Sequence, residues 1–218
     1  MAVIAGVVLI NVGVVLCGEA ENCETLPRID GTGDADAERL LLVASMLRSK
    51  TGAGSSGYSG VGSSGGTICR YFLVPYLNLF HKTYKEVHIK IINGTSLKCA
   101  EMLETNQVDL IVANSPNSAL NNNMKILDVK DFTDVFVANP DVFPYGDKPL
   151  SLEELQNLPI LMLNKLSTTS AFLHNLFLQN SLDLVPAIEI SSNDLLIDLA
   201  KIGLGIAFVP DFCIKNTL

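Results

Sequence analysis

Short hydroxyl and amide side chains gather in four turns of this sequence, each directly before a predicted helix. Ser, Thr and Asn in such turns can present an oxygen and several backbone N–H groups to a small anion or a polar metabolite. The same residues are also the best helix N-caps, so each turn taken alone is better explained by capping than by a ligand contact. Because the turns recur along the chain, we interpret them together as binding positions. They lie at residues 66–67, 93–96, 167–170 and 191–193.

The remaining chemistry-bearing residues do not form a pattern typical of catalysis or metal binding. The 5 cysteines contain no C-x-x-C pair, and none of the 3 histidines lies at metal-ligand spacing from them. We therefore expect free thiols, no metal and no cofactor. No nucleophile is paired with a base, and the acidic residues are not spaced as a catalytic dyad. The sequence favours binding without catalysis, and we expect no enzyme activity.

Net charge and composition limit the classes of function. The 218 residues are enough for one large domain or two small lobes, and a hydrophobic content of 48% is enough for a core. With 15 Lys and Arg against 23 Asp and Glu, the formal net charge is -8. A domain that holds DNA or an anionic membrane by its own surface normally has the opposite sign. We therefore disfavour direct nucleic-acid binding by this chain.

From residue 66 onwards the pattern alternates helix with strand, which predicts a parallel sheet with right-handed crossovers in a two-lobed α/β arrangement. Helices enter such a sheet at the carboxyl ends of its strands, where ligands collect. An Asn-rich stretch at 121–123 separates two strand–helix series, so we expect a boundary near 127–132, with lobe I at 67–128 and lobe II at 129–218. Strands are predicted at 87–92, 108–113, 135–138, 160–163, 187–190 and 205–209, and helices at 68–84, 97–106, 169–180 and 194–202.

The first 66 residues differ from the rest in composition. Residues 1–17 are apolar but lack a basic segment before them and are too short for a membrane span, so we expect a buried strand or helix there and leave 1–33 unassigned. Residues 34–50 form an amphipathic pattern with acids first and bases last, typical of a helix that needs a partner. Residues 51–66 contain seven Gly and five Ser, which favours a flexible linker.

Three segments resemble the effector-binding domain of LysR-type transcriptional regulators. The first is TICRYFLVPYLNLFHKTYKEVHIKIINGTS from Thr67, followed by LETNQVDLIVANSP. The others are SLEELQNLPILMLNKLSTTSAFLHNLF and EISSNDLLIDLAKIGLGIAFVPDF, of which GLGIA with Pro210 is the most specific part. The resemblance runs from about Gly66 to the end of the sequence. Residues 37–50 are similar to the linker helix through which such regulators form dimers.

This resemblance implies a type 2 periplasmic-binding-protein-like fold that binds a small effector, commonly anionic, in the cleft between two lobes. It also implies a cytoplasmic homodimer. Ser191 and Ser192 are weaker candidates for ligand contacts, since their turn can face a lobe interface. The positions that correspond to ligand contacts are Thr67, Thr95, Ser96, Asn114, Thr168 and Thr169.

The sequence departs from the family in three places. Nothing in the first 33 residues resembles a recognition helix, so DNA would be contacted only through a helix-turn-helix domain absent from this chain. The Gly/Ser stretch stands where the family has its first strand, and the sequence stops where the family continues with elements that return to the first lobe. We therefore expect an incomplete first lobe.

Two other classes of protein remain as alternatives. An extracytoplasmic solute-binding protein of the same fold would need residues 1–17 as a leader, which the missing basic segment disfavours. An enzyme on a related scaffold would need an acid, base or metal constellation, and the sequence offers none that is convincing.

Overall fold

The computed structural model describes residues 2–3, 10–19, 58–64, 66–83, 85, 87–108, 110–115, 117–121, 124–146 and 149–214. The helix expected at 34–50 lies outside these residues. The chain divides into two compact units: unit 1 is Met1–Val12 with Asp131–Leu218, and unit 2 is Gly13–Lys130. One division, between residues 12 and 13, falls within strand β2 (Ile10–Glu19), and the other, between residues 130 and 131, falls within strand β6 (Met124–Ala138).

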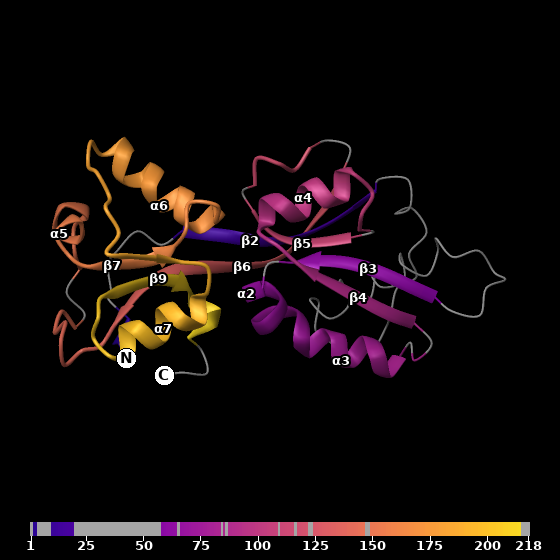
Figure 1. The fold of residues 1–218 in the computed structure, drawn as a ribbon, viewed down its shortest axis with the longest axis horizontal. Coiled ribbons are helices and arrows are strands. Elements are labelled where there is room, and N and C mark those ends of the chain that lie inside the picture. The colour runs from indigo at the N-terminus through magenta and orange to yellow at the C-terminus, as the bar shows by residue number, and fades with distance from the viewer. Residues whose placement is uncertain are drawn as a thin grey trace. The chain divides into compact units, whose positions relative to one another are not determined.

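Unit 2 is built on strands in the order β4-β3-β5-β2. Strand β3 pairs in parallel with β4 and with β5, whereas β2 runs antiparallel to β5. Figure 1 shows α3 and α4 on opposite sides of these strands. The bounds are β2 (Ile10–Glu19), β3 (Tyr58–Ser64), β4 (Val87–Asn93), β5 (Leu110–Ser115), α3 (Val74–Thr83) and α4 (Ser96–Glu104).

Strand β3 corrects the expectation of a Gly/Ser linker over 51–66 and of a missing first strand. Its residues Tyr58–Ser64 pair with Val87–Asn93 on one side, and Gly62 to Ser64 pair with β5 on the other. The hydrogen bonds that two flanking strands supply offset the entropy that this Gly-rich segment loses on ordering. Residues 51–57 lie outside the described part of the chain.

Strand β2 settles the choice left open for the N-terminal apolar segment, which forms a strand rather than a helix where the structure describes it. Its residues Gly13 to Gly18 pair with Leu110 to Ser115, so the segment extends the sheet of unit 2. Among the helices of the described residues, none has the length and apolarity needed to cross a membrane.

The helix expected at 68–84 consists of three pieces. They are α2 (Gly66–Ile68), the π-helical turn η2 (Cys69–Leu73) and α3. The N–H of Val74 bonds to the carbonyl of Cys69, five residues back instead of four. Pro75 follows immediately and has no N–H to continue the α-helical ladder. We attribute the wider turn to this proline, because π-turns occur where the regular ladder is interrupted.

Unit 1 has strands in the order β6-β9-β7-β8, with β1 (Ala2–Val3) paired to β6. Strand β7 is parallel to β8 and β9, while β6 is antiparallel to β9. Figure 1 shows α6 and α7 on opposite sides of β7 and β9. The bounds are β7 (Ile160–Leu163), β8 (Ile188–Ile190), β9 (Ile206–Pro210), α5 (Leu152–Gln156), α6 (Thr168–Gln179), α7 (Asn193–Lys201) and the 3-10 turn η3 (Asp211–Cys213).

Each unit buries apolar side chains between its strands and helices. In unit 1, the rings of Phe136 and Phe208 pack in a tilted arrangement with their centroids 4.6 Å apart, and Phe177 of α6 is fully buried. In unit 2, Cys99 and Ala100 of α4 pack among the buried residues of β5. Helix α5 was not expected from the sequence, although Ser151 and Glu154 form a capping box that a Ser-x-x-Glu pattern signals.

The GLGIA segment links α7 to β9 through two glycines with different roles. Gly203 follows the end of α7 with a φ of +81°, a left-handed conformation that glycine adopts at little cost. Gly205 lies against β7, because a Cβ there would overlap the carbonyl oxygen of Pro159 and come within 2.7 Å of Leu161 Cδ2. That carbonyl accepts the Ile206 N–H at 2.9 Å, so the backbones at Pro159 and Ile206 cannot move apart freely.

We expect Gly205→Ala to lower the free energy of unfolding by about 1 to 3 kcal/mol, because the added methyl group overpacks the β7–β9 contact. Chemical denaturation of the full chain measures this. Gly66→Ala is the control, since a Cβ there has nothing within 4 Å and should leave stability equal or higher. Equal stability of both variants would show that the close approach at Gly205 is unimportant.

Candidate functional site

Parallel pairing places the polar turns of unit 2 at one edge of its sheet. Strands β3, β4 and β5 all point the same way, and Ser64 at the end of β3 pairs with Asn93 at the end of β4. Helix α2 begins just after β3, and α4 begins just after β4. Thr67, Thr95 and Asn114 therefore lie at the carboxyl edge of these strands, where parallel α/β sheets bind ligands.

Ser96 and Asn114 are in direct contact at this edge. The Oγ of Ser96 accepts the backbone N–H of Asn114 at 3.1 Å, and Ser96 is only 7% exposed. Asn117 adds a second link, since its Nδ2 donates to the carbonyl of Ser96 at 3.1 Å. Asn117 was not among the expected contact residues, although an amide in the turn that follows β5 was a usable signal. These bonds join the start of α4 to the end of β5.

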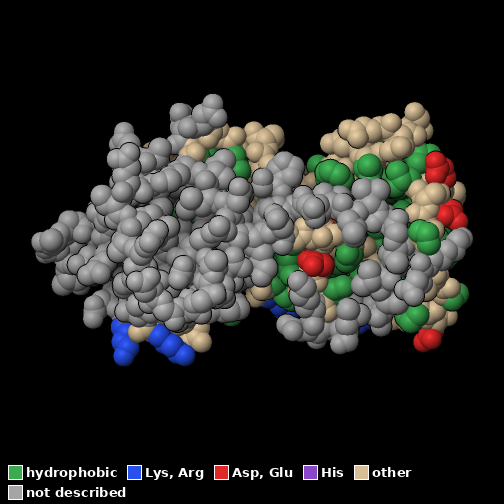
Figure 2. Space-filling view, turned by 180° about the vertical axis from the view of Figure 1, so that it is seen from behind, with side chains coloured by type: hydrophobic (Ala, Val, Ile, Leu, Met, Phe, Trp, Pro, Cys, Tyr) green, Lys and Arg blue, Asp and Glu red, His purple; other side chains and the backbone are tan. Residues whose placement is uncertain are grey.

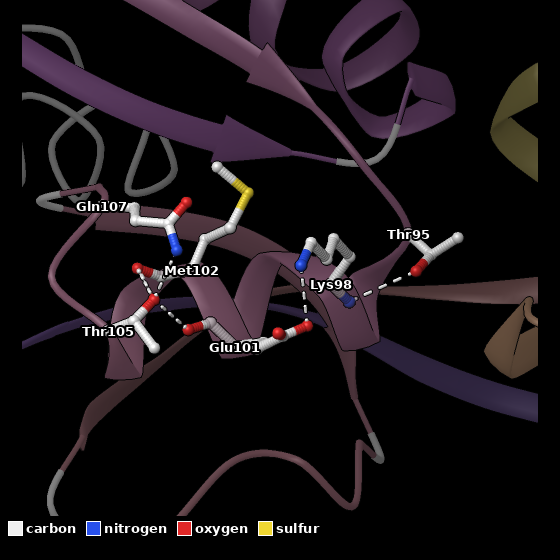
Figure 3. A network of polar contacts seen from close by, with 6 residues as sticks. All are labelled: Thr95, Lys98, Glu101, Met102, Thr105 and Gln107. Atoms are coloured by element: carbon white, nitrogen blue, oxygen red, sulfur yellow. Dashed lines mark hydrogen bonds and ion pairs between the residues drawn. The ribbon is translucent and has the colours of Figure 1, made fainter.

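Thr95 is the N-cap of α4, as Figure 3 shows. Its Oγ1 accepts the N–H of Lys98 at 3.2 Å, and the Nζ of Lys98 pairs with Glu101 Oε2 at 2.9 Å. At the other end of the helix, the Thr105 hydroxyl donates to the Glu101 carbonyl at 2.8 Å and accepts from Gln107 Nε2 at 2.8 Å. The Thr95 oxygen therefore satisfies one of the free N–H groups at the start of α4.

Unit 1 has an equivalent edge. Strands β7, β8 and β9 are parallel, so the start of α6, the start of α7 and η3 all follow carboxyl ends. Strand β6 runs the opposite way, with Asp134 paired to Pro210 at the end of β9, so Asp134 also lies at this edge. Ser192 caps α7 by accepting the Leu195 N–H at 3.3 Å.

The first turn of α6 consists of Thr168, Thr169 and Ser170. Thr168 is half-buried, while Thr169 is 6% exposed and Ser170 is fully buried. The N-cap residue, Ser167, makes no side-chain hydrogen bond to this turn, whereas the caps of α4, α5 and α7 all do. The positive end of the α6 dipole thus has no hydroxyl cap from Ser167.

Asp134 is a buried carboxyl beside this turn and was not anticipated from the sequence. It is 1% exposed, and within the described residues no donor lies in hydrogen-bonding geometry to either of its oxygens. Burial, and then the negative charge of Asp211, raise the pKa of Asp134 to about 7, while the nearby Thr169 hydroxyl opposes the rise. In a strand where polar and apolar residues alternate, an acidic side chain usually faces solvent, so the sequence pattern did not predict that Asp134 is buried.

The structure thus places the six expected contact residues in two groups. Thr67, Thr95, Ser96 and Asn114 belong to unit 2, where only Ser96 and Asn114 are joined by a described hydrogen bond. Thr168 and Thr169 belong to unit 1, together with Asp134 and Asp211. Within the described part of the chain, no group of three or more His, Cys, Asp and Glu side chains could hold a metal ion.

Residues 61–218 match the protein family described as LysR substrate binding domain. The chain is 27% identical over 171 residues, 76% of its length, to a probable RuBisCO transcriptional regulator of Thalassiosira pseudonana. It is 29% identical over 146 residues, 66% of its length, to the HTH-type transcriptional activator CmpR of Synechocystis. These matches cover 55% and 46% of the relatives, so the chain spans about half the length of the proteins it resembles.

The fold is also found in solved structures. The regulatory domain of CcmR from Synechocystis, solved in complex with 2-PG, superposes with a TM-score of 0.66 at 19% identity. The superposition covers 73% of this chain and 76% of the CcmR chain. This likeness, with the family match, confirms the expected α/β fold of the type 2 periplasmic-binding-protein class.

We expect Ser96→Ala to reduce stability by about 1 to 3 kcal/mol, because the N–H of Asn114 loses its acceptor in a partly buried position. Thr95→Ala should cost about 1 kcal/mol, the usual value of an N-cap. Denaturation of both variants and of the exposed control Ser191→Ala measures the difference. If Ser96→Ala were as stable as Ser191→Ala, the hydroxyl would have no structural role.

The raised pKa of Asp134 should make stability depend on pH. Between about pH 4 and pH 7 the folded chain holds a proton that the unfolded chain has released, so the free energy of unfolding falls as pH rises through this range and is level above it. The fall is roughly 4 kcal/mol at most, since one pKa unit corresponds to about 1.4 kcal/mol.

Thermal melts of wild type and Asp134→Asn across this range measure the effect. We expect the variant to lose most of the fall and to be the more stable protein at about pH 8, where wild type holds a buried charge. Asp183→Asn, at an exposed position of unit 1, is the control and should keep the wild-type profile. Parallel profiles for wild type and Asp134→Asn would contradict the assignment.

Proposed function

Because the chain belongs to the LysR substrate binding domain family, we propose that it is the effector-sensing part of a transcriptional regulator and binds a small anionic metabolite without catalysis. The relatives reported above are transcriptional regulators by description, which supports this class of function. The complex of the CcmR regulatory domain with 2-PG supports a small molecule as the ligand.

The observation that carries the proposal is the gathering of hydroxyl and amide groups at the carboxyl edge of parallel strands in both units. In unit 1, α6 begins at that edge with Thr168 and Thr169, and its N-terminus attracts negative charge through the helix dipole. In unit 2, α4 begins at the corresponding edge with a buried hydroxyl at Ser96. We assign the ligand contacts to Thr67, Thr95, Ser96, Asn114, Thr168 and Thr169.

We assign DNA binding to a helix-turn-helix domain outside this sequence, as the name of the CmpR relative suggests for that protein. The net charge of -8 opposes DNA binding by the chain itself. On the face seen in Figure 2, the visible Lys and Arg side chains of the described residues lie along the lower edge. The proposed setting is a cytoplasmic regulator that acts as a homodimer.

Ligand binding by the full chain can be found by thermal shift with a panel of small anions that includes 2-PG, benzoate and sulfate. We expect at least one of them to raise the melting temperature, because a ligand that binds only the folded state stabilises it. If none of a broad metabolite panel does so, the sensing function is contradicted.

With a ligand in hand, Thr168→Ala should weaken binding about tenfold to a hundredfold, the effect of losing one hydrogen bond of roughly 1.5 to 3 kcal/mol to a charged group. Titration calorimetry measures the affinity, and a melt measures stability in parallel. Ser151→Ala is the matched control, because it removes the cap of α5, the helix that precedes β7 in the chain, and should lower stability alone. If Thr168→Ala bound the ligand with wild-type affinity, Thr168 would not be a ligand contact and would serve only the start of α6.

A further inference from the structure

A largely buried polar cluster lies beside the first turn of α6, and Thr169 is the member of it that the ligand contacts assigned above include. It consists of Asp134 on β6, Thr169 and Ser170 on α6, and Asp211 on η3, all within unit 1. Among the described residues, the oxygens of Asp134 and the Oγ of Ser170 are buried without a hydrogen-bond partner. Buried polar atoms are nearly always satisfied in folded proteins, so two such groups beside one helix terminus call for an explanation.

Among the described residues, no cation acts on the Asp134 carboxyl. The charged group that acts on Asp134 is Asp211, whose Oδ1 accepts the Thr133 N–H at 3.4 Å. Strand β9, which pairs with β6, carries no ionisable side chain. On α6 the titratable group is His174, and its Nε2 lies 3.9 Å from Glu189 Oε1 on β8. The surroundings of Asp134 therefore favour its neutral, protonated form.

The protonation state of Asp134 decides how well an anion is accommodated at the start of α6. A charged carboxylate beneath the first turn repels a second negative charge and competes for the Thr169 hydroxyl, which faces it. A protonated Asp134 needs no donor from Thr169, so that hydroxyl and the N–H groups of the helix terminus are available to a ligand. Burial excludes the water that would otherwise screen the repulsion.

We propose that Asp134 is a positioning residue that couples anion binding at the first turn of α6 to the uptake of one proton. The inference rests on the proposed function, since it concerns the same ligand site. The proton comes from solvent and is held on the Asp134 carboxyl while the anion is bound. The regulator then responds to pH as well as to effector concentration.

Calorimetric titration of the full chain with sulfate tests this coupling, because sulfate keeps its charge between about pH 6 and pH 9. In wild type we expect the dissociation constant to rise about tenfold for each pH unit above about 7, the slope for one linked proton. Proton uptake, obtained by repeating the titration in buffers of different ionisation enthalpy, should approach one proton per sulfate at the alkaline end. In Asp134→Asn both effects should be absent, and in Asp183→Asn both should persist.

Asp211→Asn is the second variant, and it keeps an oxygen that can accept the Thr133 N–H. Without the Asp211 charge, Asp134 ionises more easily, so the loss of sulfate affinity should begin at lower pH than in wild type. This shift tests the coupling even if Asp134→Asn does not fold.

The outcomes separate the inference from the proposed function. The coupling is wrong if wild type binds sulfate equally well at about pH 6 and pH 9, or if Asp134→Asn keeps the pH dependence of binding. In either case the proposed anion site is not contradicted. If wild type binds neither sulfate nor benzoate at about pH 6, where Asp134 is protonated, the anion site itself is wrong and the coupling falls with it.

Discussion

Parallel pairing of strands is the constraint on which the rest of this structure depends. A parallel pair cannot be joined by a tight turn, so the chain must leave each strand at its carboxyl end and return through a helix. In unit 2 this applies to β3, β4 and β5, and in unit 1 to β7, β8 and β9. Every helix that crosses over then begins at the same edge, and its free N–H groups collect there.

The free N–H groups explain why the same side chains serve structure and binding. Thr95 caps α4, and Ser96 joins that helix to β5, so replacing either one disturbs the fold as well as any ligand contact. The first turn of α6 differs, because Ser167 leaves it without a side-chain cap and a buried carboxyl lies beside it. A helix terminus left in this state is less stable alone and better suited to an anion that completes it.

At two glycine-containing places in this chain, a closely packed neighbouring backbone supplies the stabilisation that side chains supply elsewhere. Strand β3 is rich in Gly and Ser, yet it pairs on both sides with β4 and β5. Gly205 allows the start of β9 to approach Pro159 and Leu161 of the β7 segment. In both places the stabilising partner is a backbone that lies far away in the sequence. Amino-acid composition reveals the entropy that these glycines lose on folding, but it does not reveal that backbone partner.

Apart from helix α5, the sequence by itself determined the order of helices and strands from residue 66 onwards, and it also determined the positions of the polar turns. Those features follow from local periodicity and from capping chemistry, as β7 at Ile160–Leu163 and the cap at Ser192 illustrate. Only the tertiary structure decided that Tyr58–Ser64 is a strand, that Ser96 bonds to Asn114 and that Asp134 is buried beside Asp211. Each of these features depends on a neighbour that is distant in the sequence. The electric charge of that neighbour, or its hydrogen bond, outweighs the conformation or protonation state that the residue would prefer by itself.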